Sequence, residues 1–310
     1  MSITISGGIT LNGGGWTIVA PPAGNKAIFG YGGASGGVLQ SLTNLVSNTG
    51  VVANDTTGVG TARQGLAAAN YGTDKAIFGY GADGVVRSMT NLVSNTGAVA
   101  TDTSGVGTAR TDLAAAGYGT DKAIFGYGQL GDTSKQSMTN LVSNTGVVAS
   151  DTSGVGTARR ALAAAGYGTD KAIFGYGSDG TRVSTTNLVG NTGVVATDTT
   201  GVGTARTVLA AATYGTDKAI FGYGITTVNV SMTNLVSNTG VVATDTTGVG
   251  TARYYLAATG YGIDTAMFGY GSTGSMTAIT NLISNTGVVA TDTTGVGTAR
   301  QALAAAAYGS

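Results

Sequence analysis

The stretch Leu66-Ala-Ala-Ala-Asn-Tyr-Gly-Thr-Asp-Lys-Ala-Ile-Phe-Gly-Tyr-Gly81 returns with few changes along almost the whole chain. Its clearest marker is Phe-Gly-Tyr-Gly, which recurs in steps of 49, 47, 49, 47 and 47 residues, starting at Phe29, Phe78, Phe125, Phe174, Phe221 and Phe268. Self-similarity at a nearly fixed period of this size is typical of repeat proteins. We therefore expect a fold built from six copies of one unit.

Each copy contains four short segments with the length and patterning of β-strands. In the second copy they are residues 66–69, 75–80, 88–93 and 99–102. Turn residues separate them, with Tyr-Gly-Thr-Asp after the first segment and Asn-Thr-Gly after the third. A one-turn helix is the alternative for Leu-Ala-Ala-Ala, but four residues before a turn are too few to hold an isolated helix.

The order of the segments suggests how the chain closes. The sequence enters its first unit at a second segment, residues 26–31, and ends after a lone first segment, residues 303–308. If these two segments pair, no inner strand edge stays open, whereas a right-handed β-solenoid, the alternative architecture, would need distinct caps. The prediction is an all-β fold over residues 25–310, a six-bladed β-propeller with four antiparallel strands per blade, closed by the C-terminal strand pairing with the N-terminal blade.

Composition removes several classes of function. The chain has no His, no Cys and no Glu, and only 10% of its residues are charged, with a net charge of zero. Without imidazole or thiol groups the common hydrolase, zinc and redox sites are excluded, so we expect no catalytic residues, no cofactor and no metal. The balanced charge argues against a nucleic-acid partner. No apolar run reaches the roughly 20 residues of a membrane helix, so we expect no membrane insertion, and residues 1–6 lack signal-peptide features.

Four strings follow one another in each unit: Leu-Ala-Ala-Ala, Ala-Ile-Phe-Gly-Tyr-Gly, Thr-Asn-Leu-Val-Ser-Asn-Thr-Gly and Thr-Ala-Arg. In this order they resemble the kelch motif. Kelch units carry a small apolar strand, an apolar-aromatic strand ending in paired glycines and a strand leading to an Asn-rich turn, and they close on Pro-x-Arg or a similar string. Here the paired glycines are split as Gly-Tyr-Gly, and Val replaces the usual Trp after the Asn turn. The resemblance implies a propeller fold.

The copies are also unusually alike and rich in Ala, Gly, Thr and Ser. In this the chain is similar to repetitive kelch-like virion proteins of tailed, particularly marine, phages, whose N-termini can carry strings such as Ser6-Gly-Gly-Ile-Thr-Leu-Asn-Gly-Gly-Gly15. The resemblance implies a non-enzymatic structural and interaction protein of the phage tail or capsid surface, assembled in the host cytoplasm, for host attachment or particle decoration. A free carbohydrate-binding lectin propeller is the first alternative, and an enzyme using Asp, Tyr and Arg is the second.

The copies differ from one another in two places. One is the connection between the second and third segments, residues 33–42, 82–89, 129–138, 178–185, 225–232 and 272–279; the other is the residue pair after each Thr-Ala-Arg. In an antiparallel unit both lie on the same face, and loops on a rigid scaffold are where recognition is usually placed. We expect this face to bind a host-surface glycan or protein, and the alternative is loops that drift without constraint. Because Tyr and Arg are favoured at interfaces, the candidate binding residues are Arg87, Lys135, Arg160, Arg182, Tyr254 and Tyr255.

Two charged positions recur in every copy. The arginines Arg63, Arg110, Arg159, Arg206, Arg253 and Arg300 could surround a central anion, but their strict recurrence favours hydrogen bonds between blades. The aspartates Asp55, Asp102, Asp151, Asp198, Asp245 and Asp292 could hold calcium. Since calcium prefers six to eight oxygen ligands, one carboxylate per unit favours a turn-capping role.

Residues 1–24 lie outside the repeat and form a predicted N-terminal arm. Apolar residues alternate with polar or Gly positions along it, which suits a strand added to a partner's sheet. The candidate docking residues are Ile3, Ile5, Ile9, Leu11 and Trp16. The expected partners are other virion proteins or a second copy of the chain, and the alternative is a strand folded against its own propeller.

Overall fold

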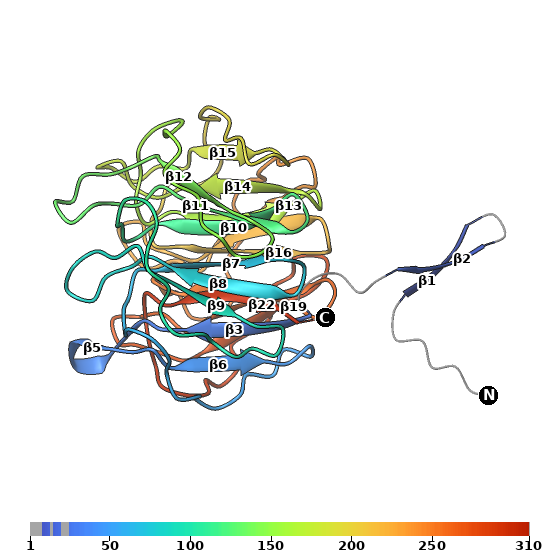
Figure 1. Ribbon diagram of the computed structural model, residues 1–310, viewed down its shortest axis with the longest axis horizontal. Helices are drawn as coiled ribbons and strands as arrows, with labels where there is room; N and C mark the ends of the chain where they lie inside the picture. Colours follow the sequence, from blue (N-terminus) through green and yellow to red (C-terminus); the bar gives the residue numbers. More distant parts are fainter. Residues whose placement is uncertain (1–7, 13–14, 20–24, 310) are drawn as a thin grey trace.

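The computed structural model describes residues 8–12, 15–19 and 25–309 (Figure 1). Within them the protein is all-β, and the repeats form six three-stranded antiparallel sheets, each with a first, a middle and a third strand. The first strands are β7 (Ala67–Tyr71), β10 (Ala114–Tyr118), β13 (Ala163–Tyr167), β16 (Ala210–Tyr214), β19 (Ala257–Tyr261) and β22 (Ala304–Tyr308). The middle strands are β8 (Lys75–Gly79), β11 (Lys122–Gly126), β14 (Lys171–Gly175), β17 (Lys218–Gly222), β20 (Thr265–Gly269) and β3 (Lys26–Gly30). The third strands are β9 (Thr90–Val93), β12 (Thr139–Val142), β15 (Thr186–Val189), β18 (Thr233–Val236), β21 (Thr280–Ile283) and β6 (Thr43–Val46).

The predicted pairing of the two ends of the repeat region is confirmed. Strand β22 pairs with β3 in the register that joins Ala304 to Gly30 and Tyr308 to Lys26. The first strands lie beside one another in the order β7, β10, β13, β16, β19 and β22, and β22 in turn lies beside β7. The Leu-Ala-Ala-Ala segments are therefore strands, not helical turns, and their neighbours close on themselves rather than continuing along an open stack.

Two circles of backbone hydrogen bonds link neighbouring sheets. At one end the N–H groups of Asp112, Ala161, Val208, Tyr255, Ala302 and Gly65 each donate to the carbonyl of the equivalent residue in the preceding sheet, over 2.8–3.0 Å, and the last bond, from Gly65 to Ala302, closes the circle. At the other end the N–H of each Tyr-Gly turn glycine donates to the carbonyl of the Asp in the turn of the following sheet, for example Gly72 to Asp121 over 2.7 Å. Asn25 replaces this Asp as the acceptor for Gly262. We call the first end the loop face and the second the turn face.

The expected fourth strand differs from the prediction. In the second unit the segment after β9 forms no continuous ladder with it: the two are joined by the isolated bridges Val93↔Val99 and Thr90↔Thr103 and by the bond from the Ala100 N–H to the Leu92 carbonyl. From one bridge to the other, β9 advances by three residues and the following segment by four. The extra residue on the second segment is characteristic of a β-bulge. The Asn91 amide donates to the Ala100 carbonyl over 3.0 Å and so occupies an acceptor that a regular ladder would use.

The core lies between neighbouring sheets. Phe78 packs against Tyr31 of the preceding sheet, with ring centroids 5.1 Å apart, and both side chains are fully buried. A Cβ on Gly79 would stand only 2.7 Å from the Phe125 ring of the next sheet. The Gly of Phe-Gly-Tyr is therefore what lets one sheet approach the next.

The remaining elements lie outside this pattern. Strands β4 (Gly33–Ala34) and β5 (Val38–Leu39) pair around the 3₁₀ turn η1 (Ser35–Gly37). Strands β1 (Gly8–Asn12) and β2 (Gly15–Val19) form a hairpin of their own, which aligns Ile9 with Ile18 and Leu11 with Trp16. Within the described residues this hairpin pairs with no strand of the repeats.

Candidate functional site

The two variable stretches of each unit meet on the loop face, as predicted. Bridges join the residue before each first strand to the start of the connection after the middle strand, for example Gln64↔Ala82, Arg160↔Ser178 and Tyr254↔Ser272. The turn face carries the nearly constant Tyr-Gly turns. Asn25, the first residue of the repeat region, is on this turn face, where its N–H donates to the Gly309 carbonyl over 2.9 Å. Figure 1 shows the loop with β5 at one side of the molecule and the C-terminus at the other.

Backbone strain is built into the loop-face circle. The six residues of the circle all have a positive, left-handed φ. One of them is a glycine, Gly65, which adopts this conformation freely; the other five have φ between 51° and 53° and are Asp112, Ala161, Val208, Tyr255 and Ala302. Left-handed φ is rare for non-glycine residues and costly for a β-branched one such as Val208. The circle of hydrogen bonds holds these residues there. It fixes the position of the side chains that stand at its edge.

Four of the six predicted binding residues line one pocket on the loop face. Arg160 and Arg182 stand on the β13–β15 unit, and Tyr254 and Tyr255 precede β19. The pocket has a volume of about 350 Å³, and the other residues that line it are Ala161, Ser178, Gly180, Thr181, Thr207, Val208 and Ile225. Three consecutive units therefore contribute to it. The first brings the cationic groups and two hydroxyls, the second brings Thr207, Val208 and Ile225, and the third brings the aromatic groups.

An acidic group outside the sequence prediction adjoins this pocket. The Arg160 Nη1 atom lies 3.7 Å from the Asp112 Oδ2 atom, and the Gln129 amide donates to the same oxygen over 3.2 Å. Burial raises the pKa of the Asp112 carboxyl, against the opposing charge of Arg160. Burial also raises the pKa of Tyr255, and the Asp112 charge adds to this effect. Tyr255 and Asp112 are both members of the loop-face circle, and two other members separate them in each direction around it. They therefore lie on opposite sides of the circle.

The other two predicted residues lie outside this pocket. Arg87 is held by Asp83 in a two-pronged ion pair, with Nε–Oδ1 and Nη2–Oδ2 distances of 2.9 and 3.0 Å. Lys135 is bridged to Gln129 at the position that Arg182 occupies relative to Ser178, and its charge helps to lower the pKa of Asp179, after the hydrogen bonds from Thr181. Both lie on the loop face, on neighbouring units.

The recurring arginines have the structural role that the sequence favoured. The Arg63 guanidinium is fully buried and lies 4.4 Å from the Tyr31 ring centroid of the preceding sheet. It donates to the Tyr80 carbonyl over 2.8 Å and to the Asn91 Oδ1 atom over 2.7 Å, both in the following sheet. Each such arginine therefore ties two sheets together and is not available to a central anion.

The recurring aspartates accept hydrogen bonds from the return segment of the preceding unit, a structural role like the predicted turn capping. Asp102 accepts hydrogen bonds from the Thr61 N–H over 3.0 Å, the Thr61 hydroxyl over 2.6 Å and the Asn91 amide over 2.9 Å. Asp55 does the same for Thr298, 243 residues away, and so helps to close the circle of sheets. Within the described residues no three acidic, His or Cys side chains group closely enough to hold a metal ion.

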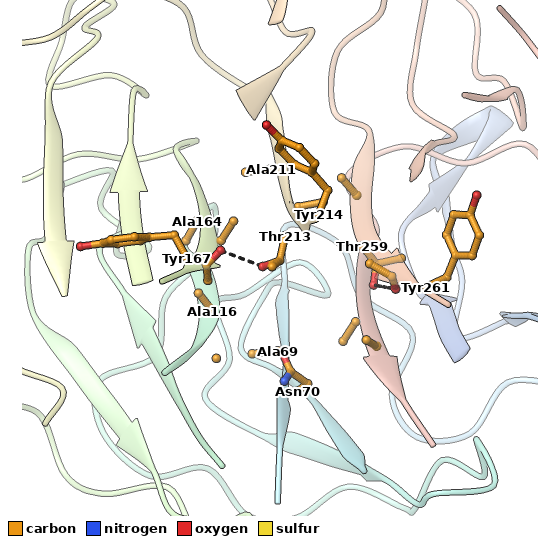
Figure 2. A pocket seen from close by; sticks show the side chains of 18 of the residues that line it. Ala69, Asn70, Ala116, Ala164, Tyr167, Ala211, Thr213, Tyr214, Thr259 and Tyr261 are labelled. Atoms are coloured by element: carbon orange, nitrogen blue, oxygen red, sulfur yellow. Dashed lines mark hydrogen bonds between the residues drawn. The ribbon is translucent and has the colours of Figure 1, made fainter. Parts of the chain in front are cut away.

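A second cavity, of about 730 Å³, runs between the six first strands. Small side chains line it, and Figure 2 shows Ala164, Ala211 and Thr213 on the surrounding strands, with the Thr213 hydroxyl donating to the Gly166 carbonyl over 2.8 Å. Its lining contains charged groups only toward the turn face, at Lys122, Lys171 and Asp264. Along the strands its wall is mostly Ala, Gly and Thr, and the first strands also contribute Asn70 and the tyrosines at their ends, Tyr118, Tyr167, Tyr214 and Tyr261.

The predicted docking residues of the arm fall into two groups. Ile9 and Leu11 are in β1 and Trp16 is in β2, so the segment expected as one strand is a hairpin within the described residues. The turn signal Asn12-Gly-Gly-Gly15 explains this. Ile3 and Ile5 lie outside the described residues.

A comparison of the sequence with models of known protein families gave no match, and a comparison with curated protein sequences gave none either. In the described part of the chain we find no helix with the length and apolar character to span a membrane.

Proposed function

We propose that the chain is a six-bladed, kelch-like β-propeller that acts as a non-enzymatic binding protein. It holds a ligand on the loop face and is attached to its carrier through residues 1–24 on the turn face. One observation carries the proposal. Arg160, Arg182, Tyr254 and Tyr255 line one pocket on the loop face, while Asn25, where the arm joins the repeats, belongs to the turn face.

The buried contacts between sheets support a rigid scaffold for this role. Arginine, tyrosine and phenylalanine side chains repeat the same contacts at every junction, including the one that β22 closes. Such a scaffold leaves the loops free to differ without loss of the fold. The proposed carrier is a phage particle, on the strength of the resemblance in composition and repeat style, and the proposed role is host attachment or decoration.

Deletion of residues 1–24 tests the attachment. We expect the shortened chain to fold, because the described strands of the repeats pair only among themselves, and to fail to sediment with particles that incorporate the full chain. A full chain with both Arg182→Ala and Tyr254→Ala is the matched control, and it should enter particles but attach poorly to host cells. If particles incorporated the shortened chain as well as the full chain, the arm would not be what attaches the protein to the particle.

A free lectin is the second candidate, favoured by the tyrosine pair and the hydroxyl groups that line the pocket. In that case deletion of residues 1–24 would leave glycan binding unchanged, and no particle would incorporate the full chain.

A further inference from the structure

Many backbone groups around the loop-face pocket are already hydrogen-bonded to one another. Arg160 and Ser178 exchange both backbone bonds, as do Thr207 with Ile225 and Tyr254 with Ser272. The N–H groups of Ala161, Val208 and Tyr255 belong to the loop-face circle, and so do the carbonyls that accept them. These paired groups are not open to an extended peptide, so we assign recognition to the side chains that line the pocket.

Those side chains are unevenly charged. Arg182 is exposed, and within the described residues it makes no ion pair, whereas Arg87 is held closely by Asp83. Arg160 reaches Asp112 only at 3.7 Å and keeps 42% of its side chain exposed. Guanidinium groups bind a carboxylate through two parallel hydrogen bonds. The side of the pocket on the β13–β15 unit therefore suits an anionic group.

The opposite side presents two aromatic rings. Tyr254 and Tyr255 have centroids 5.5 Å apart and planes inclined at 50°, so their faces point in different directions. Tyrosine offers an apolar ring face together with a hydroxyl that can donate and accept. The hydroxyls of Ser178 and Thr181, on the same unit as the arginines, and of Thr207, on the next unit, also line the pocket. Ring faces, hydroxyl groups and cations together match a sugar ring that carries hydroxyls and an acid group.

We propose that this pocket binds an acidic saccharide, with its carboxylate on Arg182 and Arg160 and its sugar ring against Tyr254 and Tyr255. The inference rests on the proposed function and names the class of its ligand. A volume of about 350 Å³ lies within the range of roughly 300–1,000 Å³ found for small-molecule sites.

Titration calorimetry of the full chain with trigalacturonate tests the proposal. We expect one site per chain, binding that weakens as salt is added, and affinity at least about tenfold lower in Arg182→Ala and in Tyr254→Ala. Lys75→Ala is the matched control, since it removes one positive charge from the turn face and should bind as the parent does. A neutral galactose trisaccharide should bind at least about tenfold more weakly than trigalacturonate.

Three results would overturn the acidic saccharide: no binding of trigalacturonate at millimolar concentration, equal binding of the neutral trisaccharide, or tighter binding of a short poly-aspartate peptide. A host-cell attachment assay distinguishes a wrong ligand class from a wrong proposed function. If the two pocket variants lose attachment while trigalacturonate does not bind, only the ligand class is wrong. If they attach as the parent does, the loop-face function is wrong as well.

Discussion

At the scale of single residues, the glycine of Phe-Gly-Tyr is a point of close contact between sheets. A Cβ on Gly79 would meet the Phe125 ring at 2.7 Å and again at 3.0 Å. The ring is packed in a fully buried site and cannot withdraw without moving its sheet. We expect Gly79→Ala to lower the free energy of unfolding by about 1–3 kcal/mol, as overpacking of a well-filled core does, measured by urea denaturation.

Gly131→Ala is the matched control for this change. It adds the same methyl group in a loop-face connection, where the nearest atom, Val86 Cγ2, is 3.6 Å from the new Cβ. Its unfolding midpoint should stay at the parent value. Equal midpoints for Gly79→Ala and the parent would show that the sheets are not in the close contact described above.

The structural roles of the recurring arginines and aspartates could be predicted from the sequence because both residues are present in every copy. A residue that makes the same contact at all six junctions is expected not to vary. Asp112 was not predictable as a neighbour of the pocket. It stands in the variable pair after Thr-Ala-Arg, and only the circular arrangement brings it opposite Tyr255 and beside Arg160.

At the scale of elements, each aspartate of the repeat ties the return segment of one unit to the third strand of the next. Burial raises the pKa of Asp102, but hydrogen bonds from Thr61 and Asn91 and the charge of Arg63 together hold it below its ordinary value of 3.8. A carboxyl with a lowered pKa in the folded state stabilises the fold above the unfolded pKa, and that stability is lost as the pH falls through the folded pKa. The other five aspartates are lowered in the same way.

We therefore expect the unfolding midpoint in urea to stay constant from neutral pH down to about pH 5 and to fall steeply below about pH 4. Asp102→Asn should have a lower midpoint at neutral pH and a weaker dependence on pH below 4, because one of the titrating groups is gone. An acid dependence as steep as that of the parent would show that Asp102 carries no share of it.

Element types and their order followed from the sequence, but the fourth strand and the hairpin did not. The segment after β9 alternates like a strand, and it fails as one because the Asn91 amide takes the Ala100 carbonyl and an extra residue enters the pairing. That competition depends on a side chain of another strand, which local propensity does not contain. The β1–β2 hairpin was within reach, since Asn12-Gly-Gly-Gly15 is a turn signal between two alternating stretches.

At the scale of the whole molecule, β22 and β3 pair in the register of the other hairpins, although they come from opposite ends of the repeat region. The other turns read Tyr71-Gly-Thr-Asp-Lys75. In sequence, Tyr308-Gly309-Ser310 corresponds to the first three residues of this string and Asn25-Lys26 to the last two. Asn25 accepts the hydrogen bond from Gly262 that Asp74 accepts from Gly309 at the next junction. A peptide bond from Ser310 to Asn25, with no residue added, would therefore complete a turn of the same length as the others.

Because the six hairpin turns are equivalent, we expect that the chain ends can be moved from the β22–β3 junction to another of these turns. A permuted chain that starts at Asp121, joins Ser310 directly to Asn25 and ends at Thr120 exchanges one open turn for another and leaves every sheet with its three strands. Because the number of closed loops is unchanged, we expect its free energy of unfolding to lie within about 1 kcal/mol of that of residues 25–310. The control permutation opens the chain between Ile77 and Phe78, inside a fully buried middle strand, and should not fold. If the two permuted chains were equally stable by urea denaturation, or if the first did not fold, the six junctions would not be equivalent.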